Sequence, residues 1–398
     1  MPLRPPAGFI SAFFDPLNNP NAPTIGTATG GDTIASVAFT APANVGGSAI
    51  SSYSALSTPG GVVASAASSP ISVTGLTNGT AYTFAVWATN TYGPSAYSAA
   101  SNSVTPDVLT RGLFGGGDTL TNVIEYINIA STGNSTDFGD LLAATRSMCA
   151  CASSTRGIFA GGDSGGDGIN VIQYVTIATT GNAIDFGDIL RNGYWQFAAC
   201  SSETRGVMGG GLSPNGGTTT ANTNYITIAT TGNTTTFGTL TSARRLLASC
   251  GSTTRGIFGG GEGPVNIIDY ITIATTGDAT DFGDLTVARS YLQSCSNATR
   301  GLFAGGNVSG SPRNTIDYIT IASTGDATDF GDLTGESAFA YTRASCSSTT
   351  RAVFTGTGGE LYILGYVTIS TTGNSSTFGN LSAGKYQYAG LSNCHGGI

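Results

Sequence analysis

The side chains best suited to bind another molecule gather in the variable segments of the second half of the chain. Arginine and lysine stand there beside tyrosine and tryptophan, a mixture favoured at recognition hot spots and for stacking on sugar rings. We predict non-covalent ligand binding by Arg146, Arg191, Tyr194, Trp195, Arg244, Arg289, Tyr291, Arg313, Tyr341, Arg343, Lys385 and Tyr386. The alternative is that these arginines brace neighbouring structural units and that the aromatic rings pack between sheets.

Catalytic chemistry has less support in the sequence. A carbohydrate-active enzyme needs two carboxyl groups about 5 to 10 Å apart in a pocket. The acids of the variable segments that could supply them are Asp163, Asp167, Glu262, Glu336 and Glu360. A single histidine, His395, argues against a metal enzyme with clustered histidine ligands. We therefore expect no enzyme, no cofactor and no metal, and leave open only calcium in the Asp-rich turns, since hard cations need several converging oxygens.

A segment that recurs six times supplies the scaffold for these side chains. Each copy begins with a Thr-Arg dipeptide, passes through a glycine cluster and a Tyr-Ile-Thr-Ile-like strand, and reaches a Phe-Gly-Asp-Leu-like turn. The arginines are Arg111, Arg156, Arg205, Arg255, Arg300 and Arg351, at a period of 45 to 51 residues. This period is typical of β-propeller blades, each made of four short antiparallel strands.

The spacing within each copy separates a constant end from a variable end. Twelve residues separate Tyr126 from Phe138, and the same interval returns in all six copies. Length varies only after the glycine cluster and after the Phe-Gly-Asp-Leu turn, two places that an up-and-down blade puts on one face. The face with insertions is often the binding face of a repeat protein. On the constant face we expect the repeating arginines to pair with Asp137 and its counterparts.

These repeats resemble kelch repeats, in the Gly-Gly after the second strand, the later Tyr and the preceding Arg. Phenylalanines such as Phe138 stand where kelch repeats have Trp. The resemblance implies a divergent kelch-like array of the sort found in bacteriophage structural proteins. The chain ends with an extra strand, Lys385 to Cys394, which we expect to complete the first blade and so remove open edges. Residues 107–398 are thus predicted to form a six-bladed propeller.

The seven cysteines of the chain follow the repeat. Cys151, Cys200, Cys250, Cys295 and Cys346 each precede the repeating arginine by five residues. We expect Cys394 to be the sixth member of this set, and Cys149 to be an extra thiol. Matched positions in separate blades are too far apart for disulfides, so these cysteines are predicted to be small, buried and reduced.

Two further segments precede the repeats. Residues 1–22 form a proline-rich arm whose apolar centre contains Phe9, Ile10, Phe13 and Phe14. We expect this arm to dock on an assembly partner or to cover the next domain. Residues 23–106 resemble a fibronectin type III domain, in Phe39-x-x-Pro42 followed by Gly46-Gly47-Ser48-x-Ile50-x-x-Tyr53, and in Leu76-x-x-x-Thr80-x-Tyr82-x-Phe84-x-Val86. The resemblance implies a β-sandwich in which the Tyr82 hydroxyl bonds to nearby backbone.

Composition narrows the classes of function. Charged residues make up only 10% of the chain and the net charge is −8, which argues against a general nucleic-acid binder. No apolar run approaches the roughly 18 residues that a membrane span needs. With the resemblances, these features predict an all-β virion protein, multimeric in the particle and attached to other virion proteins through the arm. Its propeller would recognise a host glycan or surface protein. The alternative is a purely architectural virion component, such as a capsid decoration or tail connector.

Overall fold

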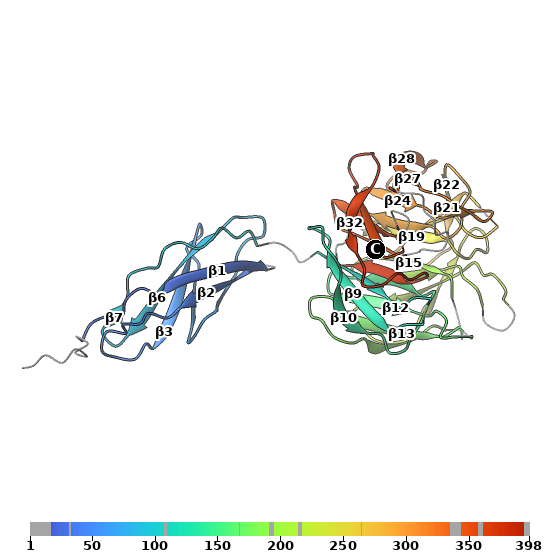
Figure 1. Ribbon diagram of the computed structural model, residues 1–398. Helices are drawn as coiled ribbons and strands as arrows, with labels where there is room; N and C mark the ends of the chain where they lie inside the picture. Colours follow the sequence, from blue (N-terminus) through green and yellow to red (C-terminus); the bar gives the residue numbers. More distant parts are fainter. Residues whose placement is uncertain are drawn as a thin grey trace, which may run out of the picture. The chain divides into compact units, whose positions relative to one another are not determined.

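The computed structural model describes residues 17–398, except 32, 107–109, 119, 167, 191–194, 214–216, 264, 335–343, 357–360 and 394–398. The apolar arm residues Phe9, Ile10, Phe13 and Phe14 lie outside this range. The chain divides into two compact units, Met1–Leu109 and Thr110–Ile398. The described residues form strands and turns without a helix, which makes the protein all-β (Figure 1). Accordingly, none of them forms a helix long and apolar enough to cross a membrane.

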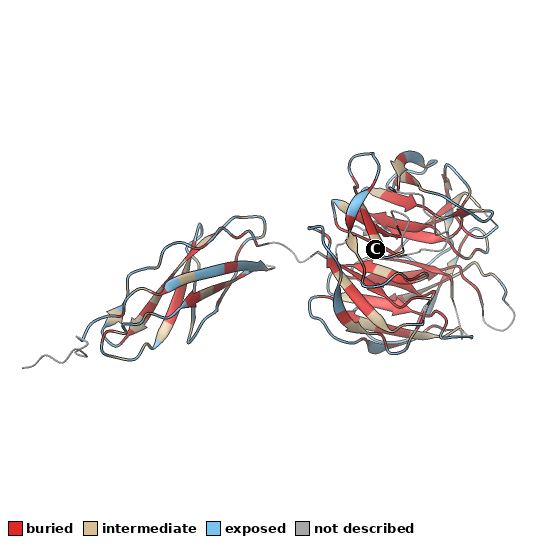
Figure 2. Cartoon of the chain, viewed as in Figure 1, coloured by how far each residue is buried: buried red, intermediate tan, exposed pale blue. Residues whose placement is uncertain are grey.

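The first unit has two antiparallel sheets with a shared apolar core. Its strand order is β1-β2-β5 in one sheet and β4-β3-β6-β7 in the other. The strands are β1 (Thr24–Gly31), β2 (Ile34–Thr40), β3 (Ser52–Thr58), β4 (Val63–Ala66), β5 (Ile71–Thr74), β6 (Thr83–Asn90) and β7 (Gly93–Pro94). Alternate residues of β6 are buried, because successive side chains point to opposite faces of a sheet. Figure 2 marks the buried residues in red.

One sequence expectation for the first unit is confirmed. The Tyr82 hydroxyl accepts a hydrogen bond from the Thr77 amide at 3.1 Å. Trp87 faces away from the core that contains Phe84 and Val86, and its ring packs edge-on against Tyr97 with 5.2 Å between centroids.

The second unit consists of six four-stranded antiparallel sheets. We number them I (β10-β9-β8-β33), II (β11 to β14), III (β15 to β18), IV (β19 to β22), V (β23-β24-β27-β28) and VI (β29 to β32). A small β25-β26 hairpin extends from sheet V.

Each sheet is built from short strands, of which strands one and two are almost wholly buried. In chain order, the strands of sheets I to III are β8 (Arg111–Gly115), β9 (Val123–Asn128), β10 (Thr136–Asp140), β11 (Cys149–Ala152), β12 (Arg156–Ala160), β13 (Val171–Thr176), β14 (Ile184–Asp188), β15 (Ala198–Ser201), β16 (Arg205–Gly209), β17 (Asn222–Thr227) and β18 (Thr235–Thr239). Those of sheets IV to VI, with the closing strand, are β19 (Ala248–Gly251), β20 (Arg255–Gly259), β21 (Ile267–Thr272), β22 (Thr280–Asp284), β23 (Gln293–Ser296), β24 (Arg300–Ala304), β25 (Asn307–Val308), β26 (Ser311–Pro312), β27 (Thr315–Thr320), β28 (Thr328–Asp332), β29 (Ser345–Ser347), β30 (Arg351–Thr355), β31 (Ile363–Thr368), β32 (Ser376–Asn380) and β33 (Ala389–Ser392).

The last strand of the chain joins the first sheet of the unit. β33 pairs antiparallel with β8, with Leu391 opposite Leu113, so the C-terminal strand supplies the first strand of sheet I as expected. Figure 1 shows this red segment returning to the blue-green strands that begin the unit. The six first strands then contact one another in the order β33, β11, β15, β19, β23, β29 and back to β33.

Serine side chains connect these first strands where backbone pairing is absent. Ser294 Oγ donates to the Ser249 carbonyl at 2.6 Å, and Ser345 Oγ donates to the Ser294 carbonyl at 2.7 Å. Two residues further along each strand, a second set of serines repeats the arrangement, as in the 2.7 Å bond from Ser296 Oγ to the Gly251 carbonyl. Small side chains at these places let six strands approach a common centre.

The constant turn between strands three and four covers the outer edge of the preceding sheet. In sheet II, Gly181 N–H donates to the Phe138 carbonyl of β10 at 2.8 Å, and Asn182 Oδ1 accepts from the Asp140 amide at 3.0 Å. The turn of sheet I covers β32 of sheet VI in the same way, with Gly133 N–H bonded to the Phe378 carbonyl. A β-carbon at Gly139 would clash with this turn. The fixed twelve-residue interval is therefore the length that covers an otherwise open edge.

The repeating arginines connect neighbouring sheets, and the expected pairing with Asp137 and its counterparts is wrong. Each guanidinium lies 4.4 to 4.9 Å from the centroid of the tyrosine ring on strand three of its own sheet. Its Nη1 donates to a carbonyl just after strand three of the next sheet, from Arg111 to Ile177 through to Arg351 to Ile129. Stacking on the tyrosine ring and hydrogen bonds to backbone carbonyls thus take the place of the expected ion pair with Asp137 and its counterparts.

The matched cysteines are buried free thiols, as predicted. Cys151 packs against Gly206 of the next sheet, where a β-carbon would lie 2.7 Å from its Sγ. The expectation that Cys394 is the sixth member is wrong. Leu391 occupies that place, since it pairs with Leu113 as Cys346 pairs with Val353, and its side chain packs against Gly157. Cys394 itself lies outside the described residues.

Burial makes these thiols unreactive. It raises the pKa of Cys151 and that of Cys295 to about 12, and a thiol reacts as its thiolate. We expect a thiol-specific disulfide reagent at pH 8 to modify at most one of the seven cysteines of the folded protein, and all seven in denaturant. Rapid modification of two or more in the native state, counted by mass spectrometry, would contradict this packing.

Candidate functional site

A ring of left-handed residues surrounds one end of the central space between the six sheets. Ser147, Gln196, Leu246, Tyr291 and Gln387 each stand two residues before a first strand and have φ between 55° and 60°. Backbone hydrogen bonds link them in turn, from Tyr291 N–H to Leu246 O, Leu246 to Gln196, Gln196 to Ser147 and Ser147 to Gln387. The counterpart in sheet VI lies outside the described residues. We call this ring the mouth; it lies at the end where the segment lengths vary.

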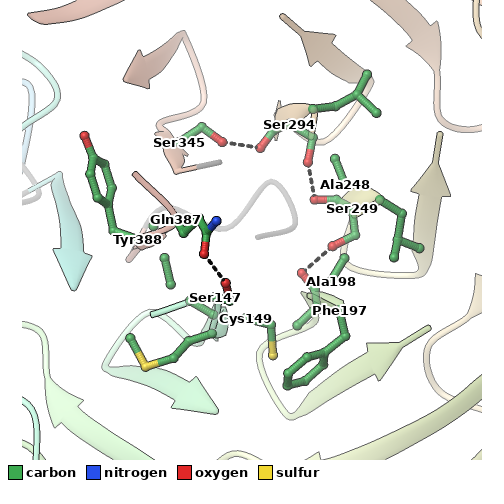
Figure 3. A pocket seen from close by; sticks show the side chains of 17 residues that line it. Ser147, Cys149, Phe197, Ala198, Ala248, Ser249, Ser294, Ser345, Gln387 and Tyr388 are labelled. Atoms are coloured by element: carbon green, nitrogen blue, oxygen red, sulfur yellow. Dashed lines mark hydrogen bonds between the residues drawn. The ribbon is translucent and has the colours of Figure 1, made fainter. Parts of the chain in front are cut away.

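A pocket of about 60 Å³ lies inside the mouth. Figure 3 shows its lining side chains around the centre, with Ser147 bonded to Gln387 and with Ser249, Ser294 and Ser345 following one another along one wall. Met148, Phe197, Leu247 and Leu292, each directly before a first strand, add an apolar band. Most of each of these side chains is packed in a core between sheets, so the band presents only its edge to the pocket, beside the serine hydroxyls.

Three cations from the predicted ligand-binding set lie in the interior. The side chains of Arg289 and Asp317 are both fully buried, with Nη2 to Oδ2 at 2.5 Å, and Arg289 Nη1 also donates to the Gly305 and Thr315 carbonyls. Arg244 pairs with Asp269 in the same manner. Lys385 Nζ lies 3.7 Å from Glu125 Oε2. For these three residues the structure favours the bracing alternative.

The acids of these pairs also join adjacent sheets. Asp269 of sheet IV accepts hydrogen bonds from the Thr241 hydroxyl and amide, just after the last strand of sheet III. Asp317 accepts from the Thr286 hydroxyl at 2.5 Å. Burial lowers the pKa of Arg244 and that of Arg289, while the paired carboxylates oppose this shift. Each buried charge is thereby compensated on several sides.

A pattern in the sequence could have identified these pairs. The cation stands six residues before the matched Cys (or Leu391), and the acid stands directly before the repeating Tyr. Where that acid is present, the cation is present: Glu125 with Lys385, Asp269 with Arg244 and Asp317 with Arg289. Where it is replaced, the cation is replaced too: Gln173 with Thr145, Asn224 with Tyr194 and Gly365 with Ala340. Comparing repeats with one another would have placed these residues inside.

The residue directly after the position of the interior cations is an arginine in sheets II and IV. Each of these two arginines forms an ion pair near the surface. Arg146 Nη2 lies 2.7 Å from Asp163 Oδ2, and Arg245 Nη2 donates to Glu262 Oε1 at 2.6 Å. Burial by itself would raise the pKa of Asp163, but hydrogen bonds from the Gly165 and Gly166 amides and from Arg146 hold that pKa below its usual value. Two of the acids considered for catalysis, Asp163 and Glu262, are therefore each paired with an arginine of their own sheet.

The remaining predicted residues are half-buried or exposed, or lie outside the described range. Trp195, Tyr291 and Tyr386 are half-buried around the mouth, and Arg313 is exposed after the β25-β26 hairpin. The residues of the predicted set outside the described range are Arg191, Tyr194, Tyr341 and Arg343, and the same holds for Asp167, Glu336 and Glu360. The described part of the set thus reduces to one aromatic group at the mouth and one nearby cation.

Among the described residues, no group of three or more His, Cys, Asp or Glu side chains is placed to hold a metal ion. Comparison with models of protein families and with curated proteins found no match to this chain.

Proposed function

We propose that Thr110–Ile398 is a six-bladed β-propeller and that residues 23–106 form a fibronectin type III-like sandwich. The ring of first strands, the return of β33 to β8 and the covering of every outer edge by the next sheet's turn support the propeller. The confirmed Tyr82 bond supports the sandwich. A propeller is a scaffold, and its function resides in the site that it carries.

We further propose that this is a virion protein whose propeller recognises a host-surface glycan or protein at the mouth. One observation carries the recognition part: the repeating residues are used up in joining sheets, whereas Trp195, Tyr291 and Tyr386 remain partly exposed around the end where segment lengths vary. Half-exposed aromatic rings stack on sugars, and Arg313 would meet acidic or sulfated groups. The virion setting rests on the resemblance to phage structural proteins.

Binding of the full chain to host cells and to an array of acidic and sulfated glycans tests this proposal. We expect Trp195→Ala and Arg313→Ala each to weaken binding at least about fivefold, which is the effect of losing roughly 1 kcal/mol at an interface. Tyr97→Ala, an exposed aromatic of the first unit, is the matched control and should leave binding unchanged. Binding that survives both propeller substitutions, in variants with unchanged melting temperature, would refute recognition at the mouth.

The architectural alternative is favoured by a different observation, the buried pairing of Arg244, Arg289 and Lys385. These cations stabilise the ring rather than a ligand. A density map of the intact particle would distinguish the two functions. Recognition requires the mouth to face solvent, and architecture requires the mouth to be covered by another virion protein.

A further inference from the structure

We propose that the pocket inside the mouth binds a primary ammonium group on an aliphatic stem, such as the end of a lysine side chain or of a polyamine. This proposal concerns the lining of the pocket, and the aromatic rim enters it only as an added attraction for a cation. It holds or fails independently of the host-recognition proposal.

Three serine hydroxyl groups along one wall of the pocket already donate their protons in hydrogen bonds to backbone carbonyls. Ser249 Oγ donates to the Ala199 carbonyl, Ser294 Oγ to the Ser249 carbonyl and Ser345 Oγ to the Ser294 carbonyl, at 2.6 to 2.7 Å. A serine hydroxyl has one proton and two acceptor lone pairs. Three neighbouring hydroxyls of sheets IV, V and VI therefore have only acceptor capacity left, and this arc favours an occupant that donates several hydrogen bonds from one atom.

An apolar band separates this arc from the mouth. Leu247 and Leu292 stand two residues before Ser249 and Ser294, each directly ahead of the strand, and both members of each pair line the pocket. Residues two apart on a strand share a face and are about 6 to 7 Å apart along it. Hydrocarbon above the donor atom over that length would lie against the edge that Leu247 and Leu292 present to the pocket. A lysine ammonium on its four-carbon stem has this combination of three donors and methylenes.

Aromatic rings and an acceptor near the mouth favour a cation over a neutral donor. Trp195, Tyr291 and Tyr386 are partly exposed there, and aromatic faces attract cations. Gln196 Oε1 is buried beside Phe197 of the apolar band, and none of the described residues donates a hydrogen bond to it. Among the described residues that line the pocket, Gln387, which accepts from Ser147, is the only one whose side chain also has N–H donors.

Water is the competing occupant. At about 10 to 15 Å³ for each molecule, a pocket of about 60 Å³ has room for about four to six waters. Waters would satisfy the hydroxyl arc but would make no use of the edge of the apolar band that lines the pocket, whose side chains are otherwise packed in the cores between sheets. The distinction is therefore whether one molecule uses both walls.

Calorimetry on the full chain with small probes tests this proposal. We expect n-butylammonium to bind, and n-butyltrimethylammonium, which has the same stem and charge but no N–H, to bind at least about tenfold more weakly, since hydrogen bonds to a charged group are lost. 1-Butanol and potassium chloride at the same concentrations should give no binding signal. Equal binding of the trimethyl compound, a signal from potassium alone, or no binding of n-butylammonium would each overturn the proposal.

A pair of serine variants localises the probe. Ser294→Ala removes one acceptor of the arc and should weaken n-butylammonium about tenfold. Ser296→Ala is the matched control, because it removes the same kind of serine-to-carbonyl bond from the same strand at a residue that does not line the pocket. Equal weakening by both variants would show that the effect is structural and would refute binding at the arc. Should Ser294→Ala not fold, the comparison of the two ammonium probes on the unsubstituted chain still decides the question.

Discussion

Replacing Arg289 by threonine should destabilise the second unit by about 3 to 5 kcal/mol. The substitution leaves the Asp317 carboxylate buried without its cation, and breaking a buried ion pair by removing one partner has this cost. The Gly305 and Thr315 carbonyls also lose a charged donor. The free energy of unfolding would be measured in urea from the fluorescence of Trp195, in a Trp87→Phe background so that one tryptophan reports on this unit.

The double variant Arg289→Thr with Asp317→Gln should regain most of that loss. It transplants the Thr145 and Gln173 pair of sheet II, where Gln173 Oε1 accepts from the Leu142 amide at 2.7 Å in place of the acid. A neutral replacement of a buried pair is often close to neutral in stability. If the double variant were as unstable as Arg289→Thr alone, the pairing rule between repeats would not reflect charge compensation.

Leu391→Asp should cost at least about 4 kcal/mol and prevent β33 from completing sheet I. Leu391 is fully buried between Leu113 and Gly157, and none of the ion pairs of the described residues lies there to compensate a carboxylate. An isolated buried charge is among the few changes that exceed the usual range for one substitution. An unpaired β8 edge would also promote association. Urea unfolding and size-exclusion chromatography would measure both effects.

Leu391→Cys is the matched control for this substitution. Five other sheets place cysteine at the same position, against glycine or alanine of the next sheet, so the smaller side chain should cost about 1 to 2 kcal/mol and leave the protein monodisperse. A Leu391→Cys variant as unstable as Leu391→Asp would mean that Leu391 does not occupy the position of the matched cysteines.

The all-β class and the closing strand were predictable because both depend on local pattern. Alternation of apolar residues identifies strands, and a surplus strand at the end of a repeat array has one open place to go. The partners of the arginines were not predictable from spacing within one repeat. Arg111 meets Ile177 and Tyr126, and a carbonyl acceptor carries no signature in the sequence.

The candidate site was harder to predict because the sequence of a single repeat does not show whether a cation is buried or exposed. Arg244 and Arg245 are adjacent, yet one is buried against Asp269 and the other pairs with the more exposed Glu262. Only the joint loss of cation and acid in other repeats distinguishes them. Leu391 shows the opposite difficulty, since the position was clear but the residue type that marks it had changed.

The joining of each sheet to the next has a mechanical consequence. Neighbouring sheets are connected by serines near the centre, by arginine-to-carbonyl bonds further out and by the covering turn at the rim. These connections are loaded in parallel, so a pulling force that separates two sheets must rupture all three at nearly the same extension. The ring should therefore resist tension without opening gradually, and then open in a single cooperative step.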